Sequence, residues 1–180
     1  MTLLSSEDLV AIVEQRARDL GFYAVVDNTC DDWSYSAAAE YLLERLRDLR
    51  RDHRRVCLIS SGEVTVELSP GVSAEGSDKL GIGGRNQHFA LYAATLLGSL
   101  DACTVVLSAG TDGIDGNSFA AGAVVDEKTL LDDEKLLSRA QRSLERFDSG
   151  TFLQEAGLNI VTGATGNNLR DLRILLAAEC

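Results

Sequence analysis

The chain has 180 residues, of which 45% are hydrophobic and 25% charged, the composition of a soluble globular protein with one core. Lys and Arg number 17 against 28 Asp and Glu, so the formal net charge is -11. A surface this acidic repels phosphate backbones and anionic lipids, so we expect neither nucleic acid nor a membrane as partner. No signal peptide precedes residue 10 and no apolar stretch is long enough to span a membrane, which predicts a cytoplasmic protein.

The first third of the chain predicts helix, strand, helix and strand in that order. Apolar residues recur at helical spacing from residue 9 to residue 20, and residues 22–27 then indicate a short strand. A second amphipathic helix is expected from about residue 34 to residue 52. The run VCLISS, residues 56–61, predicts a buried strand, and VTVEL, residues 64–68, alternates as a further strand does.

The remainder continues the alternation of helices and apolar strands. Residues 69–84 are rich in glycine and predict a mobile loop, and a helix is expected from about residue 86 to residue 100. CTVVLSA, residues 103–109, predicts a buried strand, followed by helices near 132–147 and 149–156. The apolar runs NIV and LRILLAA bracket the turn TGATGNN, residues 162–168. We expect a single α/β domain: a layered sheet, mostly parallel or mixed, with helices on both faces.

Four loops that follow apolar strands share glycine, hydroxyl, amide and acidic side chains: residues 60–63, 69–85, 109–117 and 162–168. In α/β sheets ligands collect beyond the carboxyl ends of strands, and such loops offer N–H and O–H donors to anionic oxygens. In GTDGIDG, residues 110–116, the Asp-Gly pairs are consistent with simple tight turns. The alternative is close approach of the backbone to a ligand, with Asp112 and Asp115 coordinating Mg²⁺ together with substrate oxygens.

Arg85 is the strongest single candidate for binding an anion. It follows two glycines and precedes an amphipathic helix, so its planar guanidinium and the helix N-terminus together suit carboxylate or phosphate; the alternative is a surface arginine beside a loop. Asn86 is expected to cap the helix and His88 to lie on its surface rather than act as a base. GIGGRN does not match a dinucleotide fingerprint, because Asn86 stands where the last glycine should be.

Several segments, in order and spacing, resemble the signature segments of the MOFRL family, the C-terminal half of class II glycerate kinases. They are LISSGEVTV, GGRNQHFAL, LSAGTDGIDG with the following AAGAVVD, and TGATGNNLRDLRI. The resemblance implies that residues 1–180 form a MOFRL-like C-terminal domain, which with an N-terminal domain makes a cleft where ATP and Mg²⁺ support phosphorylation of glycerate to 2-phosphoglycerate. It implies catalytic roles for Arg85 and Asp112 and metal binding by Asp112 and Asp115. The substrate-binding residues that it implies are Ser61, Gly62, Glu63, Arg85, Asn86, Gln87, Thr111, Asp115, Thr165 and Asn168.

The sequence also departs from the family pattern. His88 stands where the family usually has glutamate, Ser61 stands where the family has the first glycine of Gly-Gly-Glu, and TGATGNNLRD lacks the proline of TGPTGTNVND. The family's N-terminal domain, with the lysine expected to assist catalysis, has no counterpart here, so we expect the isolated chain to be inactive. Alternatives are a freestanding module that binds small anions or regulates without catalysis and, less favoured, a hydroxypyruvate reductase. A homodimer is left open.

Overall fold

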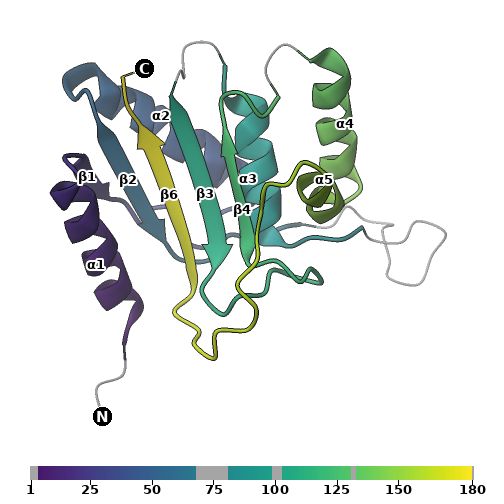
Figure 1. The fold of residues 1–180 in the computed structure, drawn as a ribbon, viewed down its shortest axis with the longest axis horizontal. Coiled ribbons are helices and arrows are strands. Elements are labelled where there is room, and N and C mark those ends of the chain that lie inside the picture. The colour runs from purple at the N-terminus through teal and green to yellow at the C-terminus, as the bar shows by residue number, and fades with distance from the viewer. Residues whose placement is uncertain (1–3, 68–80, 99–102, 131–132, 180) are drawn as a thin grey trace.

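The computed structural model describes residues 4–67, 81–98, 103–130 and 133–179, which form a mixed six-stranded sheet of order β1-β2-β6-β3-β4-β5 (Figure 1). Its strands are β1 (Tyr23–Val26), β2 (Val56–Ser61), β3 (Thr104–Gly110), β4 (Gly122–Asp126), β5 (Asn159–Ile160) and β6 (Asp171–Ala177). β1 and β2 run parallel, and every other neighbouring pair is antiparallel. The prediction of a mixed α/β sheet is confirmed.

The helices that the described residues form are α1 (Ser6–Asp19), α2 (Tyr35–Asp52), α3 (Arg85–Leu96), α4 (Glu134–Glu145) and α5 (Ser149–Glu155). α2 and α3 cover one face of the sheet, and α1 lies on the opposite face near β1 and β2 (Figure 1). Because helices lie on both faces, that part of the prediction is also confirmed. No helix in the described parts of the chain has the length and hydropathy needed to cross a bilayer.

The larger core lies between the sheet and helices α2 to α5. Its fully buried side chains include Leu42, Leu58, Phe89, Val106, Leu153 and Leu175. A smaller core forms under α1, where Val10 and Ala17 meet Cys57 and Ile59 of β2. β6 serves both cores, because Leu175 faces the larger one and Ile174 packs against the smaller one. This two-sided burial explains why β2 and β6 read as almost continuous apolar runs.

Residues 64–67 differ from the expectation, and residues 69–84 lie mostly outside the described part of the chain. Residues 64–67 do not form a strand; Thr65 makes a single parallel bridge with Ser34. The backbone N–H of Thr65 donates to the carbonyl of Trp33 at 2.8 Å, and that of Tyr35 donates to the carbonyl of Thr65 at 2.9 Å. The segment thus runs beside the start of α2. The mobile loop predicted for residues 69–84 lies mostly outside the described residues, which resume at Gly81.

One rim of the sheet gathers the loops that the sequence singled out. β2 and β3 end there and β6 begins there, at the lower edge in Figure 1. The register places Ser61 opposite Leu172 and Gly110 opposite Asp171. The 162–168 turn leads into β6 at this rim, and α3 begins beside it. Antiparallel pairing therefore brings the ends of β2 and β3 and the start of β6 to one place.

Candidate functional site

Arg85, the first residue of α3, is held by two carboxylates: that of Asp171, the first residue of β6, and that of Glu63, in the loop after β2. Its Nε donates to Oδ2 of Asp171 at 2.6 Å and its Nη2 donates to Oδ1 of Asp171 at 3.1 Å. Its Nη1 donates to Oε2 of Glu63 at 2.9 Å. Hydrogen bonds to described residues thus use three of the five N–H donors of the guanidinium. With 37% of the side chain exposed, Arg85 retains donors for a ligand.

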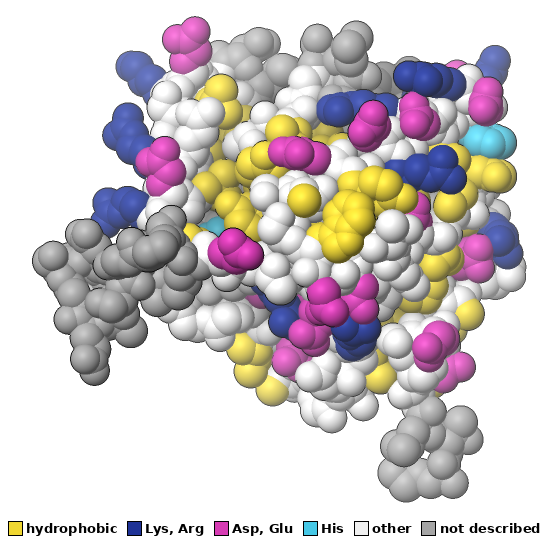
Figure 2. All heavy atoms as spheres, turned by 180° about the vertical axis from the view of Figure 1, so that it is seen from behind, with side chains coloured by type: hydrophobic (Ala, Val, Ile, Leu, Met, Phe, Trp, Pro, Cys, Tyr) yellow, Lys and Arg dark blue, Asp and Glu magenta, His cyan; other side chains and the backbone are white. Residues whose placement is uncertain are grey.

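The charges around Arg85 do not leave a spare positive charge. Burial lowers the pKa of Arg85, but hydrogen bonds and charges from Asp171 and Glu63 outweigh burial and raise it. Arg85 therefore stays protonated, while its two acidic partners give the trio an excess of negative charge. Acidic and basic side chains also lie close together in the lower middle of the face that Figure 2 shows. An anion bound beside Arg85 would need a further cation to offset the excess.

Asp115 caps α3 from a loop distant in sequence. Its Oδ1 accepts from the backbone N–H of Asn86 at 3.0 Å, and its Oδ2 accepts from that of Gln87 at 2.8 Å. The N-cap residue, Gly84, has no side chain with which to do this. Burial raises the pKa of Asp115 to about 6, although the hydrogen bonds from α3 lower it. Both carboxylate oxygens of Asp115 thus accept hydrogen bonds from the N-terminus of α3. This is the same terminus that the sequence predicts as a binding site for an anion.

The glycines of the 110–116 loop admit neighbouring backbone. Gly113 has φ +88° and Gly116 has φ +61°, a region that L side chains rarely adopt. A Cβ at Gly113 would overlap the carbonyl oxygen of Gly163, and one at Gly116 would overlap that of Gly83. The glycines therefore let this loop approach the 81–84 segment and the 162–168 turn, whereas the close approach of its backbone to a ligand stays a prediction.

Asp112 and its neighbours link two loops at the rim. The Asp112 carboxylate accepts from the N–H of Ile114 at 3.1 Å, and its carbonyl accepts from the N–H of Thr165 at 3.0 Å. Thr165 Oγ1 donates to the carbonyl of Thr111 at 2.6 Å, and Thr111 Oγ1 donates to the carbonyl of Arg170 at 2.7 Å. Both threonines thus hold backbone together and position the loop that carries Asp112.

The described contacts of Ser61, Gly62 and Asn168 are made with residues other than Arg85. The N–H of Ser61 donates to Oδ1 of Asn28 at 2.8 Å, and Ser61 lines a smaller hollow of about 310 Å³ beside α1. Gly62 has φ +130°, and a Cβ there would meet the carboxylate of Asp31. Asn168 is exposed, and its Oδ1 accepts from the N–H of Arg170 at 3.1 Å. Of the predicted Ser61–Glu63 group, the structure brings only the Glu63 side chain to Arg85.

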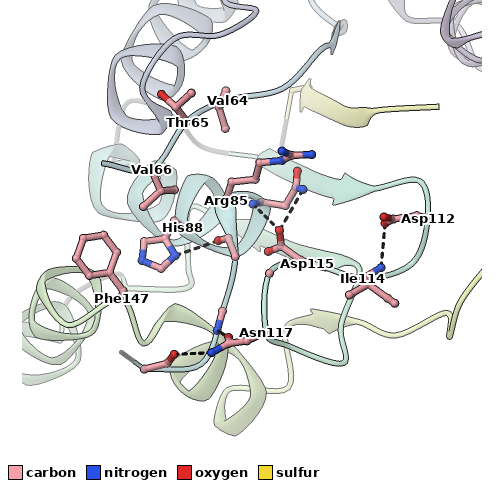
Figure 3. Close-up of a pocket in the computed structure, with 15 residues that line it drawn as sticks. Val64, Thr65, Val66, Arg85, His88, Asp112, Ile114, Asp115, Asn117 and Phe147 are labelled. Atoms are coloured by element: carbon pink, nitrogen blue, oxygen red, sulfur yellow. Dashed lines mark hydrogen bonds between the residues drawn. The ribbon is translucent and has the colours of Figure 1, made fainter. Parts of the chain in front are cut away.

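A pocket of about 750 Å³ opens at this rim (Figure 3). From the predicted site it contains Arg85, Asn86, Asp112 and Asp115. The other residues predicted to bind substrate are not among those that line it: Ser61, Gly62, Glu63, Gln87, Thr111, Thr165 and Asn168. Its further walls come from residues 64–66, the 81–84 glycines, Ile114, Gly116, Asn117, His88 and Phe147. The pocket thus combines a charged side with an apolar, aromatic side.

His88 is buried, so its predicted place on the helix surface is wrong. It is 2% exposed, its ring stacks near Phe147, and its edge meets Tyr35. Nδ1 lies 3.0 Å from the carbonyl oxygen of Gly84 and 2.8 Å from Oγ of Ser149. A nitrogen facing a carbonyl oxygen must carry a proton, which assigns the Nδ1–H tautomer. Burial lowers the pKa of His88, so the ring is neutral at pH 7.

Sequence reasoning did not select Asp171 or Arg173, although both are charged and buried at the start of β6. A signal was present in DLRILLA: the two charged residues alternate with apolar ones and so lie on one face of the strand. The Asp31–Arg170 pair was also missed. Arg170 donates through both terminal nitrogens to Asp31, at 2.9 and 2.8 Å. That pair ties the turn before α2 to the residue preceding β6.

Within the described parts of the chain, no group of three or more His, Cys, Asp or Glu side chains is placed to hold a metal. Mg²⁺ can be held by one or two carboxylates when substrate oxygens complete its coordination. Asp112 fits that requirement, because it lines the pocket and is only partly buried. Asp115 does not fit, because α3 engages both of its oxygens.

Comparison with known proteins shows the family to which the chain belongs. The chain is 32% identical over 162 residues to the D-glycerate 2-kinase of Thermotoga maritima, covering 88% of this chain and 36% of that protein. It is 36% identical over 125 residues to the glycerate kinase of Danio rerio, covering 67% of this chain and 23% of that protein. The chain therefore spans well under half the length of these relatives.

Solved structures agree with the sequence matches. The crystal structure of the Thermotoga maritima glycerate kinase superposes with a TM-score of 0.80 at 31% identity, over 97% of this chain and 41% of that one. A Pyrococcus horikoshii protein superposes with a TM-score of 0.82 at 26% identity, over 100% of this chain and 40% of that one. The sequence profile of the MOFRL family matches residues 56–171, which include β2, α3, the Asp112 loop and the first residue of β6. The chain belongs to the MOFRL family and is related to the glycerate kinases.

Proposed function

We propose that the chain forms one wall of a glycerate 2-kinase site in which the terminal phosphoryl group of ATP is transferred to glycerate, giving 2-phosphoglycerate. The proposal is supported by relatives named glycerate kinases and by the convergence of Arg85 and Asp112 on one pocket. Those relatives are more than twice as long as the part that this chain matches. We expect the remaining part of the site to come from an N-terminal domain, so this chain by itself lacks turnover.

The observation that most supports the proposal is the fixed orientation of the Arg85 guanidinium. Asp171 fixes the orientation of the guanidinium, and the donors that remain bind the carboxylate of glycerate or the phosphoryl group in transfer. A planar donor set held in advance loses little freedom when the substrate binds. Arg85 would thereby orient the substrate while the pocket walls exclude water.

Because Asp171 and Glu63 offset the charge of Arg85, we expect a cation to accompany the anionic substrates. Asp112 would hold Mg²⁺ with oxygens of the bound ligands, and the ion supplies charge neutralisation for the phosphates. Thr111 and Thr165 would keep the loop of Asp112 in place through their backbone contacts. Asp115 would contribute by fixing the first turn of α3, from which Arg85 and Asn86 project.

Coupled measurement of ADP release tests the function. We expect no turnover of D-glycerate by this chain with ATP and Mg²⁺, and turnover when it is mixed with the N-terminal part of the Thermotoga maritima D-glycerate 2-kinase. Arg85→Ala in the same mixture should abolish that turnover, whereas Arg51→Ala, which changes an exposed side chain of α2, should not. Turnover by the chain alone would contradict the expected division of the site between two parts.

A freestanding module that binds small anions without catalysis is the second candidate. It is favoured by the pocket of about 750 Å³, which this chain forms from its own residues. D-glycerate binding to the isolated chain, followed by NMR, separates the two functions when read with the mixing experiment. Binding without turnover in any mixture would favour the module, and turnover on mixing would favour the kinase.

A further inference from the structure

Arg173, the third residue of β6, is a fully buried arginine. Its relative exposure is 0%, and its guanidinium lies 5.6 Å from the centre of the Phe89 ring. One nitrogen, Nη2, donates to the carbonyl oxygen of Gly62 at 2.8 Å. Nε and Nη1 are also buried and have no hydrogen-bond partner among the described residues. This arrangement leaves most of the donors of a charged group unsatisfied inside the core.

Such burial is unfavourable for stability. Removing a guanidinium from water costs several kcal/mol unless hydrogen bonds and an opposite charge compensate. The carboxylates whose charge favours the protonated form of Arg173 are Asp171 and Asp31, and neither has a hydrogen bond to it. Cys30 also raises the pKa of Arg173, whereas the positive charge of Arg85 lowers it. Burial dominates, and it lowers the pKa of Arg173. An apolar side chain would suit the surrounding core better.

Two features connect Arg173 to the site. First, Asp171 and Arg173 lie two residues apart on the same face of β6, so Arg173 supplies a second positive charge beside the carboxylate that grips Arg85. Second, the bond from Arg173 to the Gly62 carbonyl holds the peptide that immediately precedes Glu63. Glu63 is the other acidic partner of Arg85. The two contacts reach Arg85 by separate routes, one through charge and one through backbone.

We propose that Arg173 is a positioning residue: buried beneath the site, it fixes the geometry of the Asp171–Arg85–Glu63 trio. It offsets the excess negative charge of that trio and pins the turn from which Glu63 extends. Arg85 is then left with donors for a ligand, within a cluster of two acids and two arginines whose formal charges cancel. The inference deepens the proposed kinase function, but it concerns geometry that is present before any substrate binds.

The Arg85 side-chain Nε–H provides a direct readout. It donates a 2.6 Å hydrogen bond to a carboxylate that is 2% exposed, so its ¹⁵N–¹H signal should exchange slowly with water. Arg85→Lys, which lacks that group, assigns the signal. In Arg173→Met we expect the exchange to be roughly tenfold faster, with the thermal midpoint unchanged or higher. Arg173→Lys keeps a charge and a donor for Gly62, so it should restore slow exchange.

The matched control is Arg51→Met, because Arg51 is a 79% exposed arginine of α2 far from this rim. It should alter neither the signal nor the midpoint. A slowly exchanging Arg85 signal in folded Arg173→Met would overturn the proposal. Unfolding of both the Met and Lys variants would also overturn it, because Arg173 would then serve stability. All of these measurements use the chain without glycerate or ATP, so they remain decisive even if the kinase function fails its own test.

Discussion

The carboxylate of Asp171 grips the guanidinium of Arg85 along one edge, at 2.6 Å from Nε and 3.1 Å from Nη2, across 86 residues of sequence. Asp171 opens β6 and is almost fully buried, whereas Arg85 opens α3 and remains partly exposed. Because the buried carboxylate of Asp171 fixes the orientation of the guanidinium, the remaining N–H donors of Arg85 point in a defined direction. This pair gives the pocket a positively charged group with a fixed orientation.

Asp171→Asn should weaken both folding and this rigidity. The amide retains the volume, but its NH₂ group faces the donors of Arg85 and the buried charge pair is lost. We expect the free energy of unfolding in urea to fall by about 1–3 kcal/mol. Glu63→Gln is the control, because Glu63 binds the same arginine from a side chain that is 37% exposed, and should cost less than about 1 kcal/mol. Equal losses in the two variants would show that burial of Asp171 is not what matters.

Asp115→Ala should destabilise the protein through α3. The change removes the acceptors for the Asn86 and Gln87 backbone N–H groups, which then lie buried without partners. Loss of a cap of this kind costs about 1–2 kcal/mol. Asp112→Ala, in the same loop, should change the free energy of unfolding by no more than about 0.5 kcal/mol. Chemical denaturation of the two variants measures the difference, and a reversal of their order would exclude the capping role.

Stability should depend on pH through Asp115. Its pKa is about 6 in the folded protein against 3.8 for an ordinary aspartate, so between these values the folded state binds more protons than the unfolded state. The contribution of Asp115 is therefore present below pH 3.8 and is lost as pH rises through 6. Its size is on the order of 2–3 kcal/mol. The difference in unfolding free energy between wild type and Asp115→Asn, followed from pH 4 to pH 7, should shift against the wild type.

Gly113→Ala should be far more damaging than Gly166→Ala. Both glycines have positive φ, +88° and +74°, so both variants carry similar backbone strain of about 1 kcal/mol. A Cβ at Gly113 would also overlap the carbonyl of Gly163, whereas a Cβ at Gly166 meets nothing within 4 Å. We expect an additional loss of about 1–3 kcal/mol for Gly113→Ala in thermal unfolding. Similar midpoints for the two variants would mean that the loops are not held together by this contact.

The fold was largely predictable because its signals are local. Helical spacing located α1 and α2, apolar runs located β2, β3 and β6, and the MOFRL resemblance was confirmed by the match over residues 56–171. The 64–67 segment was predicted as a strand because its residues alternate, but it makes only one bridge. Alternation does not specify whether a pairing partner exists. His88 was misplaced for a related reason, since periodicity does not show how much covers a helix face.

The sequence by itself indicated the helices, most of the strands and the glycine-rich loops, although it did not indicate β4, and it marked Arg85 and the 110–116 loop as chemically distinctive. Only the tertiary structure decided what those groups do for one another. It assigned Asp115 to the end of α3, gave Arg85 the partners Asp171 and Glu63, and placed Arg173 in the core. The physical reason is that secondary structure follows from side-chain periodicity over neighbouring residues, whereas hydrogen bonds and burial at the rim depend on the register of strands distant in sequence.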